Sequence, residues 1–432
     1  MDTERSTVRA VRSALADACP ALASGSAPDA VAGVVPSYVA APSSTTEVSA
    51  LLRAAASFGL AVVPRGAGTG LGWGSPPLGC DLVVDMRVMN QVLEHAAGDL
   101  VARVQAGATI GQLASVLAAA DQQLALDAPA DATVGGVVAT GTAGPRRFRY
   151  GAPRDVLIGL TVVRADGVVA HSGGKVVKNV AGYDLGKLFS GSQGTLGLIT
   201  EATFRLHPLP AAVAWVTGEF EPAGRAGAVA AVAAASGSAL VPSAVELDWP
   251  GGPQRPLRAG VLLEGTAPGV AERAKQMSEL LASAGGSVAV AETAPARWGH
   301  LPPPGTVVRV SFWVSALDSV LEALLSAGAS AGVQPAVTGP AGAGALYACL
   351  DAGTSGEAAA RFVTALRERL SASAGSLGPR ASVAVLAAPP EVLAAAGAYG
   401  AVPGAALMRA VKDQFDPDHR MFPGRIVFAG GD

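Results

Sequence analysis

Apolar residues recur with helical spacing in two segments near the start of the chain, residues 6–19 and 45–58. The second segment also carries signals for a helix start and a helix end. Ser44 stands three residues before Glu47, as in a capping box, and Gly59 follows the last apolar turn. A further helix is predicted over 109–120, and short apolar runs predict strands over 60–63, 82–85, 100–104, 156–164 and 168–170, the last two forming a hairpin.

The pattern changes near residue 210, where helices and short strands begin to alternate. Helices are predicted over 224–236, 268–284, 316–328 and 356–372, and strands over 213–219, 259–264, 306–314 and 345–350. This alternation predicts an α+β fold with a ferredoxin-like second domain. We therefore expect a first domain over 1–210, a second over 211–403, and a segment over 404–432 that returns to the first. No repeat is visible in the sequence.

A glycine-rich loop follows the strand predicted at 60–63. The sequence from Pro64 to Pro77 reads PRGAGTGLGWGSPP, with glycine at every second position from 66 to 74. Glycines permit positive φ and let backbone N–H groups approach an anion such as a pyrophosphate. The spacing is not that of the G-x-G-x-x-G dinucleotide fingerprint, and Trp73 and Pro76 favour an irregular path over a helix. A plain glycine-rich surface turn is the alternative for this loop taken alone.

Two further segments are rich in small residues. The stretch 129–144 is small at nearly every position, as expected where a flat ring such as an isoalloxazine packs against the backbone. Tight packing between two chain segments explains it equally well. The stretch 173–208 contains a compact turn over 191–197 that enters a strand at Leu198. It also carries polar residues that could approach a phosphate or a flavin edge, namely Lys175, Lys178, Asn179, Tyr183 and Asp184.

Composition narrows the class of protein. The 432-residue chain is half hydrophobic and has a formal net charge of −3, so it has no basic footprint for nucleic acid. Its three cysteines, Cys19, Cys80 and Cys349, never form C-x-x-C, so they neither ligate an iron–sulfur cluster by themselves nor form a disulfide framework. The start lacks the features of a signal peptide, and no uncharged stretch resembles a spanning helix. We expect a soluble cytoplasmic protein, peripheral to a membrane only through partners.

Several motifs occur in a fixed order: PRGAGTG after a strand, then ATVGG, RYGAPRDVLIGL and KNVAGYDLGKLFSGSQGTLGLIT. Together they resemble the FAD-binding domain of the vanillyl-alcohol oxidase/PCMH superfamily. The segment KNVAGYDLGKL and the tail FDPDHRMFPGR are similar to its glycolate oxidase and D-2-hydroxyacid dehydrogenase branch. The resemblance covers residues 35–210, weakens over 210–400 and returns at 404–427. It implies a PCMH-type FAD-binding domain of two α/β subdomains, followed by a smaller α+β domain.

The resemblance also implies which residues contact the cofactor. The loop from Arg65 to Gly70 would wrap the FAD pyrophosphate, and Ile199 would contact the adenine side. Thr69 lies where some members carry a histidine tethered covalently to the flavin, so non-covalent FAD is implied. The full set of implied cofactor-binding residues is Pro64, Arg65, Gly66, Ala67, Gly68, Thr69, Gly70, Pro129, Ala132, Thr133, Gly135, Gly136, Gly141, Thr142, Gly144, Gly194, Gly197 and Ile199.

A metal motif of the similar single-chain dehydrogenases is missing from the second domain. Those enzymes carry a histidine pair and an H-x-G-D-G-N-x-H-like run, whereas no two of the five histidines here share metal-ligand spacing. We therefore expect no metal. Oxidising a 2-hydroxy acid calls for a base near the hydroxyl and a cation for the carboxylate. The candidates are His300 and Arg309, with Arg297 nearby.

Flavin motifs without the metal motif, together with a shortened second domain, resemble the E subunit of bacterial glycolate oxidase complexes. This implies a sister FAD subunit and an iron–sulfur subunit as partners, and a small 2-hydroxy acid as substrate. The length of 432 residues is greater than this resemblance leads us to expect. Two alternatives stay open. One is an autonomous, metal-independent FAD enzyme acting on a 2-hydroxy acid or another alcohol. The other is a scaffold without flavin, against which the intact glycine-rich loops argue.

Overall fold

The structure, a computed structural model, describes residues 2–174, 184–251, 255–296, 298–299, 305–372 and 381–426. Its chain forms two compact units. Unit 1 consists of the chain up to Ala143, Ala152–Leu209 and Pro403–Ile426, and unit 2 consists of Gly144–Gly151 and Pro210–Val402.

The sequence places residues 144–151 in the first domain, but in the structure they belong to unit 2. The reason is a pair of polar contacts. The hydroxyl of Tyr150 donates to the Glu264 carboxylate at 2.9 Å, and Arg149 donates to the Ser243 hydroxyl at 3.3 Å. Burial and the neighbouring Glu264 raise the pKa of Tyr150, which keeps its phenol protonated as a donor.

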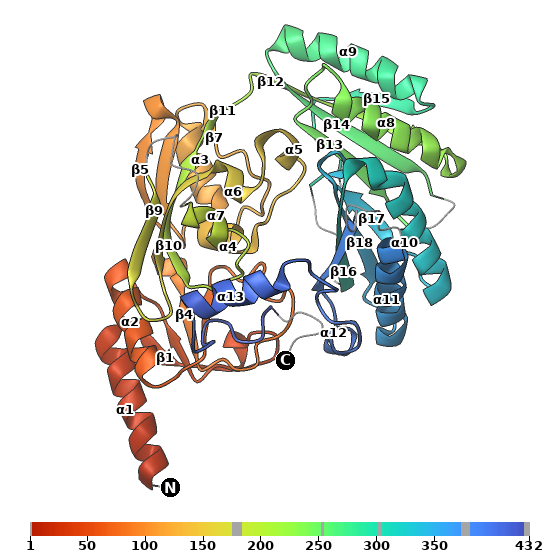
Figure 1. The fold of residues 1–432 in the computed structure, drawn as a ribbon. Coiled ribbons are helices and arrows are strands. Elements are labelled where there is room, and N and C mark those ends of the chain that lie inside the picture. The colour runs from red at the N-terminus through yellow and green to blue at the C-terminus, as the bar shows by residue number, and fades with distance from the viewer. Residues whose placement is uncertain are drawn as a thin grey trace. The chain divides into compact units, whose positions relative to one another are not determined.

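Unit 1 contains a four-stranded sheet with the order β1-β2-β4-β3. Its strands are β1 (Leu22–Ser24), β2 (Tyr38–Ala40), β3 (Val62–Arg65) and β4 (Leu82–Asp85). The pairs β2–β4 and β3–β4 are parallel, and both need a crossover between them. The helices α1 (Asp2–Ala18) and α2 (Thr45–Ser57) precede β1 and β3 and pack into the same core through Leu15, Leu51 and Leu52 (Figure 1).

A five-stranded antiparallel sheet completes the core of unit 1, with the order β5-β6-β10-β8-β9. Its strands are β5 (Val92–Ala96), β6 (Val101–Gln105), β8 (Leu157–Val163), β9 (Val169–Gly173) and β10 (Leu198–Arg205), and a separate ribbon pairs β7 (Gln122–Gln123) with β11 (His207–Pro208). The helices of this part are α3 (Ile110–Ala118), α4 (Val134–Thr140), α6 (Pro153–Val156) and α7 (Leu185–Phe189), joined from the end of the chain by α13 (Ala405–Phe415) (Figure 1).

Unit 2 is built on an eight-stranded antiparallel sheet with the order β15-β12-β14-β13-β17-β18-β16-β19. Its strands are β12 (Ala212–Phe220), β13 (Ala244–Trp249), β14 (Leu257–Gly265), β15 (Ser287–Ala291), β16 (Gly305–Phe312), β17 (Ala336–Gly339), β18 (Ala345–Asp351) and β19 (Ala381–Ala387). Its helices are α5 (Arg147–Tyr150), α8 (Arg225–Gly237), α9 (Ala267–Ser283), α10 (Leu317–Ala331), α11 (Gly356–Ala372) and α12 (Pro390–Ala396).

The large sheet of unit 2 consists of two copies of one motif. Each half runs strand, helix, strand, strand, helix, strand, and in each half the sheet order is fourth, first, third, second strand. This is the ferredoxin-like arrangement. The halves meet where β13 pairs with β17, so the two motifs form one continuous sheet. The predicted α+β class is confirmed, and the doubling is a finding that the sequence did not reveal.

Most predicted elements of the chain lie within a few residues of those observed, but α4 was missed. No helix was predicted within the stretch 129–144, which was expected to pack against a flat ring or a second chain segment. Instead, Thr133 caps a short helix whose Val137 and Val138 are buried. Gly135 fits inside it because a Cβ there would lie 2.7 Å from that of Ala106. Several short strands were also missed, namely β1, β2, β5, β13, β15, β17 and β19.

One segment of the described chain, Val314–Ala331, is long and apolar enough to span a membrane by length and composition alone. Half of it is buried inside the protein. Its residues Leu317, Leu321 and Leu324 are part of the main core of unit 2, as expected of a core helix.

Candidate functional site

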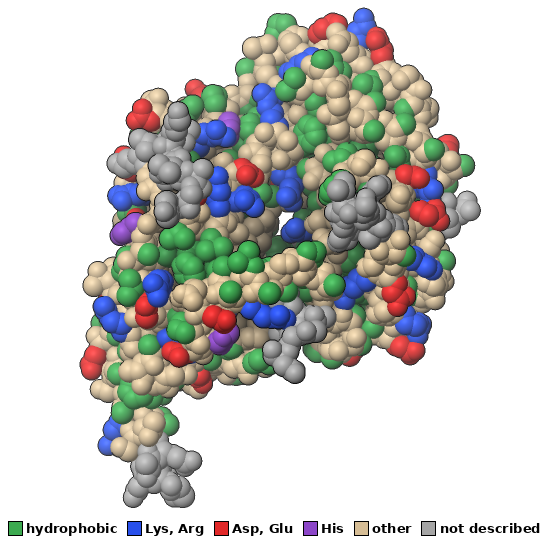
Figure 2. All heavy atoms as spheres, viewed as in Figure 1, with side chains coloured by type: hydrophobic (Ala, Val, Ile, Leu, Met, Phe, Trp, Pro, Cys, Tyr) green, Lys and Arg blue, Asp and Glu red, His purple; other side chains and the backbone are tan. Residues whose placement is uncertain are grey.

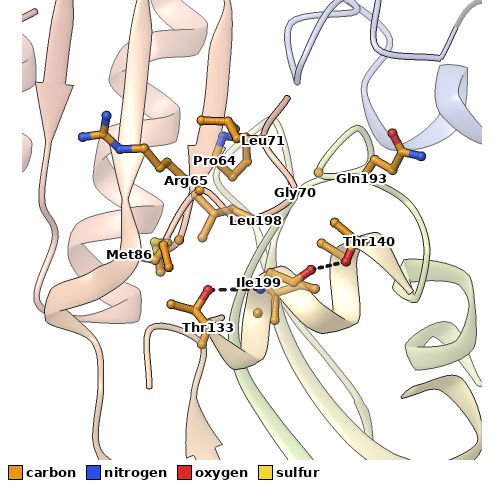
Figure 3. A pocket seen from close by; sticks show the side chains of 18 of the residues that line it. Pro64, Arg65, Gly70, Leu71, Met86, Thr133, Thr140, Gln193, Leu198 and Ile199 are labelled. Atoms are coloured by element: carbon orange, nitrogen blue, oxygen red, sulfur yellow. Dashed lines mark hydrogen bonds between the residues drawn. The ribbon is translucent and has the colours of Figure 1, made fainter. Parts of the chain in front are cut away.

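A cavity in unit 1 lies where four chain segments meet. They are the glycine-rich loop after β3, the start of α4, the turn before β10, and the tail after α13 (Figure 3). Its empty volume is about 740 Å³, part of it open to solvent. The lining residues are Pro64, Arg65, Gly66, Ala67, Gly68, Thr69, Gly70, Leu71, Met86, Ala106, Thr133, Gly135, Gly136, Ala139, Thr140, Gln193, Gly194, Gly197, Leu198, Ile199, Phe422 and Arg425.

The glycine-rich loop presents backbone donors at this cavity. Within the described part of the chain, the N–H groups of residues 66–70 donate no hydrogen bond to another residue. The loop is held internally by two later bonds, from Leu71 N to Gly68 O at 3.0 Å and from Trp73 N to Gly70 O at 3.2 Å. Gly68 has a φ of +84°, which lets neighbouring N–H groups converge. A run of unpaired amides in a glycine-rich turn is an anion-binding arrangement.

The glycines also allow the segments around the cavity to approach closely. A Cβ on Gly66 would lie 2.0 Å from Oγ1 of Thr133, so the loop backbone lies directly against the cap of α4. Thr133 is buried, and its Oγ1 accepts a hydrogen bond from Gly136 N at 3.4 Å. A Cβ on Gly194 would lie 3.3 Å from the ring of Pro64, which brings the turn before β10 against the end of β3.

The side chain of Arg65 does not point at the anion-binding amides. Its guanidinium donates to Asp29 at 3.1 Å and to Asp85 at 3.0 Å, and Figure 3 shows it directed away from Gly70. Burial alone would raise the pKa of Asp85, but hydrogen bonds from Arg87 and Arg65 outweigh it and hold that pKa below its ordinary value. Arg65 lines the cavity, and its guanidinium is paired with two carboxylates, so that its contact with a pyrophosphate stays a prediction.

The tail of the chain closes one side of the cavity. It extends the first sheet beyond β3, because Val62 N donates to Arg420 O and Phe422 N donates to Val62 O, both at 2.8 Å. Asp416, fully buried, accepts from the N–H groups of Arg420 and Met421 and pairs with Lys412. The tail is therefore fixed before it reaches Phe422 and Arg425, which line the cavity.

Not every expected cofactor residue lines the cavity. Pro129, Ala132, Gly141, Thr142 and Gly144 are absent from the lining. The oxygen of Ala132 accepts from Ile110 N, and Gly141 ends α4 with a φ of +66°. The Thr142 hydroxyl hydrogen-bonds that of Thr140, and Gly144 belongs to unit 2. Gly141 and Thr142 therefore lie at the end of α4, and Ala132 lies just before its start.

Other lining residues were not expected from the sequence, namely Leu71, Met86, Ala106, Ala139, Thr140, Gln193, Leu198, Phe422 and Arg425. For Phe422 and Arg425 a signal was present, since both lie in the tail motif FDPDHRMFPGR. The apolar residues gave none, because an apolar residue in a strand or beside a turn is ordinarily part of the core.

The residues expected to act on substrate lie elsewhere or outside the described residues. Arg309 is in β16 of unit 2, where its Nε donates to the Ser311 hydroxyl at 3.1 Å. His300 and Arg297 lie outside the described residues, as do Lys175, Lys178, Asn179 and Tyr183. Asp184 precedes α7 and pairs with Lys187 at 3.6 Å. Among the described residues, no group of three His, Cys, Asp or Glu side chains is arranged to hold a metal ion.

Comparison with known proteins gives a family match for part of the chain and a shared fold. The family described as FAD binding domain matches residues 36–173. p-Cresol methylhydroxylase, solved with substrate bound, shares the fold with a TM-score of 0.73 over 96% of both chains, at 17% sequence identity. Residues 36–173 thus match an FAD binding domain, and the fold of the chain is that of p-cresol methylhydroxylase. The range matched to the FAD binding domain includes the glycine-rich loop, Met86, Ala106 and α4, whereas the turn before β10 and the tail lie outside it.

Two sequence relatives match part of this chain. Glycolate oxidase subunit GlcD of Bacillus subtilis (strain 168) is 34% identical over 183 residues, which cover 41% of this chain and 38% of that protein. The probable mitochondrial D-lactate dehydrogenase of Danio rerio is 39% identical over 178 residues, covering 40% and 36%. The chain thus matches less than two fifths of the length of either relative.

Proposed function

We propose that this chain binds FAD non-covalently in the cavity of unit 1 and acts as an FAD-dependent oxidoreductase on a small 2-hydroxy acid. The observation that carries the proposal is the row of amides at residues 66–70, which face a cavity and donate no hydrogen bond within the described chain. A pyrophosphate satisfies such donors, because charge-assisted hydrogen bonds to an anion are stronger than those to water. The FAD binding domain match over 36–173 supports the same ligand.

The residues fit FAD in three respects. The amides of 66–70 would hold the pyrophosphate, and the close approach of Gly66 to Thr133 would fix where they point. The apolar lining by Met86, Leu198 and Ile199 suits a ring system. Thr69 offers no ring nitrogen for a covalent link to the flavin. When bound, FAD would accept the two electrons that leave the carbinol carbon of the substrate.

For substrate, we propose Arg309 as a cation for the carboxylate and His300 as a base for the hydroxyl. Arg309 is partly exposed in β16, and its Nη atoms have no hydrogen bond to another described residue, so the guanidinium has donors left for a carboxylate. The names of two relatives, glycolate oxidase subunit GlcD and D-lactate dehydrogenase, support a 2-hydroxy acid as the substrate class.

We propose further that the chain works as a cytoplasmic subunit, beside a sister FAD subunit and an iron–sulfur subunit that takes the electrons onward. Two features support this. The relative GlcD is named as a subunit. In unit 1, α7 and α13 meet through an edge-to-face contact of Phe189 and Phe415, and their outer sides carry exposed apolar residues. These are Leu185, Leu188, Leu407 and Met408. Figure 2 shows hydrophobic side chains at the surface in the region of α7 and α13. Exposed apolar patches of this kind are typical of subunit contacts.

An anaerobic visible spectrum of the purified chain, before and after adding glycolate or D-lactate, tests the proposal. A flavin band that stays with substrate but bleaches once the sister subunits are added is the expected result. A band that bleaches with the chain alone favours the alternative, an autonomous, metal-independent dehydrogenase. No flavin band after supplying FAD overturns the cofactor assignment and everything that follows from it.

A further inference from the structure

Arg425 is a buried arginine in the wall of the cavity, only 2% exposed. It lies three residues beyond Phe422, which pairs with Val62 of β3, and its own N–H donates to Phe422 O at 3.2 Å. Its guanidinium lies over the ring of Phe422, 4.5 Å from the ring centre, which fixes the plane of the side chain.

The three nitrogens of this guanidinium reach two separate loops. Nη2 donates to Gly70 O at 2.9 Å and Nη1 to Ser75 O at 3.3 Å, both in the glycine-rich loop. Nε donates to Oε1 of Gln193, in the turn before β10, at 3.1 Å. Gln193 itself has a φ of +54°, a conformation that a residue with a side chain adopts at a cost. One side chain therefore links two of the loops that line the cavity.

The glycine-rich loop depends on hydrogen bonds from outside the loop more than an ordinary loop does. Glycines lose more conformational freedom on ordering than any other residue, and the loop has few hydrogen bonds of its own. A loop ordered only by its ligand loses affinity, because ordering then opposes binding. Arg425 fixes the Gly70 end of the loop before any ligand arrives, and it places a cation in the wall beside amides suited to an anion.

We propose that Arg425 is a positioning residue that holds the Gly70 loop and the Gln193 turn in their anion-binding arrangement, and so sets the affinity for a flavin that carries a pyrophosphate. The proposal rests on the proposed function, since it concerns the same cavity. It differs from that proposal because it predicts discrimination between flavins: FAD gains from the fixed loop, whereas riboflavin, which lacks phosphate, does not.

The test compares Arg425→Gln with Arg103→Gln, a matched change in unit 1 at an arginine of β6 whose side chain is 43% exposed. The dissociation constants of FAD and of riboflavin are measured by fluorescence titration of each apoprotein, with the wild type alongside. We expect Arg425→Gln to weaken FAD binding about 10- to 100-fold, because a loss of this size corresponds to one or two hydrogen bonds to a charged group. Riboflavin binding should change less than about 2-fold. Arg103→Gln should change neither.

Equal FAD affinity in the two variants would overturn the positioning role, and so would a parallel loss of FAD and riboflavin, which indicates general disruption. If Arg425→Gln does not fold, Arg425→Lys gives the same comparison, because lysine keeps the cation but cannot reach both Gly70 O and Gln193 Oε1. Full FAD affinity in that lysine variant would also overturn the role, whereas a selective loss of FAD affinity supports it. A wild type that binds no FAD overturns the proposed function itself, and the positioning role with it.

Discussion

Gly66→Ala is expected to weaken FAD binding through a steric clash alone. The added methyl carbon would lie 2.0 Å from Oγ1 of Thr133, whereas ordinary contacts begin near 3.4 Å. The two must therefore separate by 3.4 − 2.0 = 1.4 Å. No positive φ is required at Gly66, so backbone strain adds nothing. Thr133 is buried at the cap of α4 and held by Gly136 N, so we expect the loop, and not the helix, to move.

A displacement of that size carries a loop amide out of hydrogen-bond range of a phosphate oxygen, because such bonds span about 2.7–3.2 Å. Losing one hydrogen bond to a charged group costs about 1.5–3 kcal/mol, which corresponds to roughly 10- to 100-fold in the dissociation constant. The measurement is a titration of the apoprotein with FAD, followed by flavin fluorescence, with a thermal unfolding curve of each apoprotein in parallel.

Gly72→Ala is the matched control in the same loop. A Cβ added there meets no heavy atom within 4 Å, and its φ lies outside the left-handed range, so we expect affinity within about 2-fold of wild type. Equal FAD affinity in Gly66→Ala and Gly72→Ala would refute the argument that the contact of Gly66 with Thr133 sets the position of the loop. A double variant that also carries Thr133→Ala should recover part of the loss, because it removes Oγ1. Absence of any coupling between the two sites would place the cause elsewhere.

Three further changes test the surroundings of the cavity. Arg65→Glu removes a cation from two carboxylates, so it should lower the free energy of unfolding of the apoprotein by about 3–5 kcal/mol. Urea denaturation measures this change. Loss of FAD binding with unchanged stability would contradict the ion-pair role of Arg65. Burial raises the pKa of Cys80 from 9.0 to about 11, so its contribution to stability is present below pH 9 and is lost as pH rises toward 11. One pKa unit corresponds to about 1.4 kcal/mol, so between pH 9 and pH 11 the free energy of unfolding of the wild type should fall by about 3 kcal/mol more than that of Cys80→Ala. Parallel curves of unfolding free energy against pH would refute this. Lys412→Met leaves the buried Asp416 without its cation and frees Thr195 O, so we expect about 3–5 kcal/mol of destabilisation, checked by denaturant unfolding against Asp416→Asn.

Local chemistry made much of unit 1 predictable from the sequence. The helix start at Ser44 was predicted from its spacing to Glu47, and its hydroxyl does accept from Glu47 N at 3.2 Å. The glycine-rich loop was predicted to be irregular, and it contains only bends and turns over 66–75; its residues 66–70 line the cavity, while an anion at its amides stays a prediction. Such signals are readable because capping and turn formation involve residues only a few positions apart.

Features that depend on distant segments were not predictable. Arg65 was expected to serve a phosphate, but its charge is paired with Asp29 and Asp85, which precede and follow it by many residues. The contact of Arg425 with Gly70 spans 355 positions. The doubled ferredoxin-like motif was invisible because it repeats in strand order and not in residues. A sequence pattern predicts whether a residue lies on the buried or the exposed face of its element, but it does not predict which distant residue it contacts.

The ion pairs and hydrogen bonds of the lining arginines determine which donors the cavity can offer to an anion. The arginines in its lining, Arg65 and Arg425, both donate to acceptors of the protein, so the donors left for a ligand are mainly backbone N–H groups. Backbone donors cannot be removed by substituting a side chain, and their direction is set by where the loop lies. Affinity in such a site depends on the separation of the loop from Thr133 and from the tail. A methyl group placed at Gly66 should therefore matter as much as a charge removed from the wall.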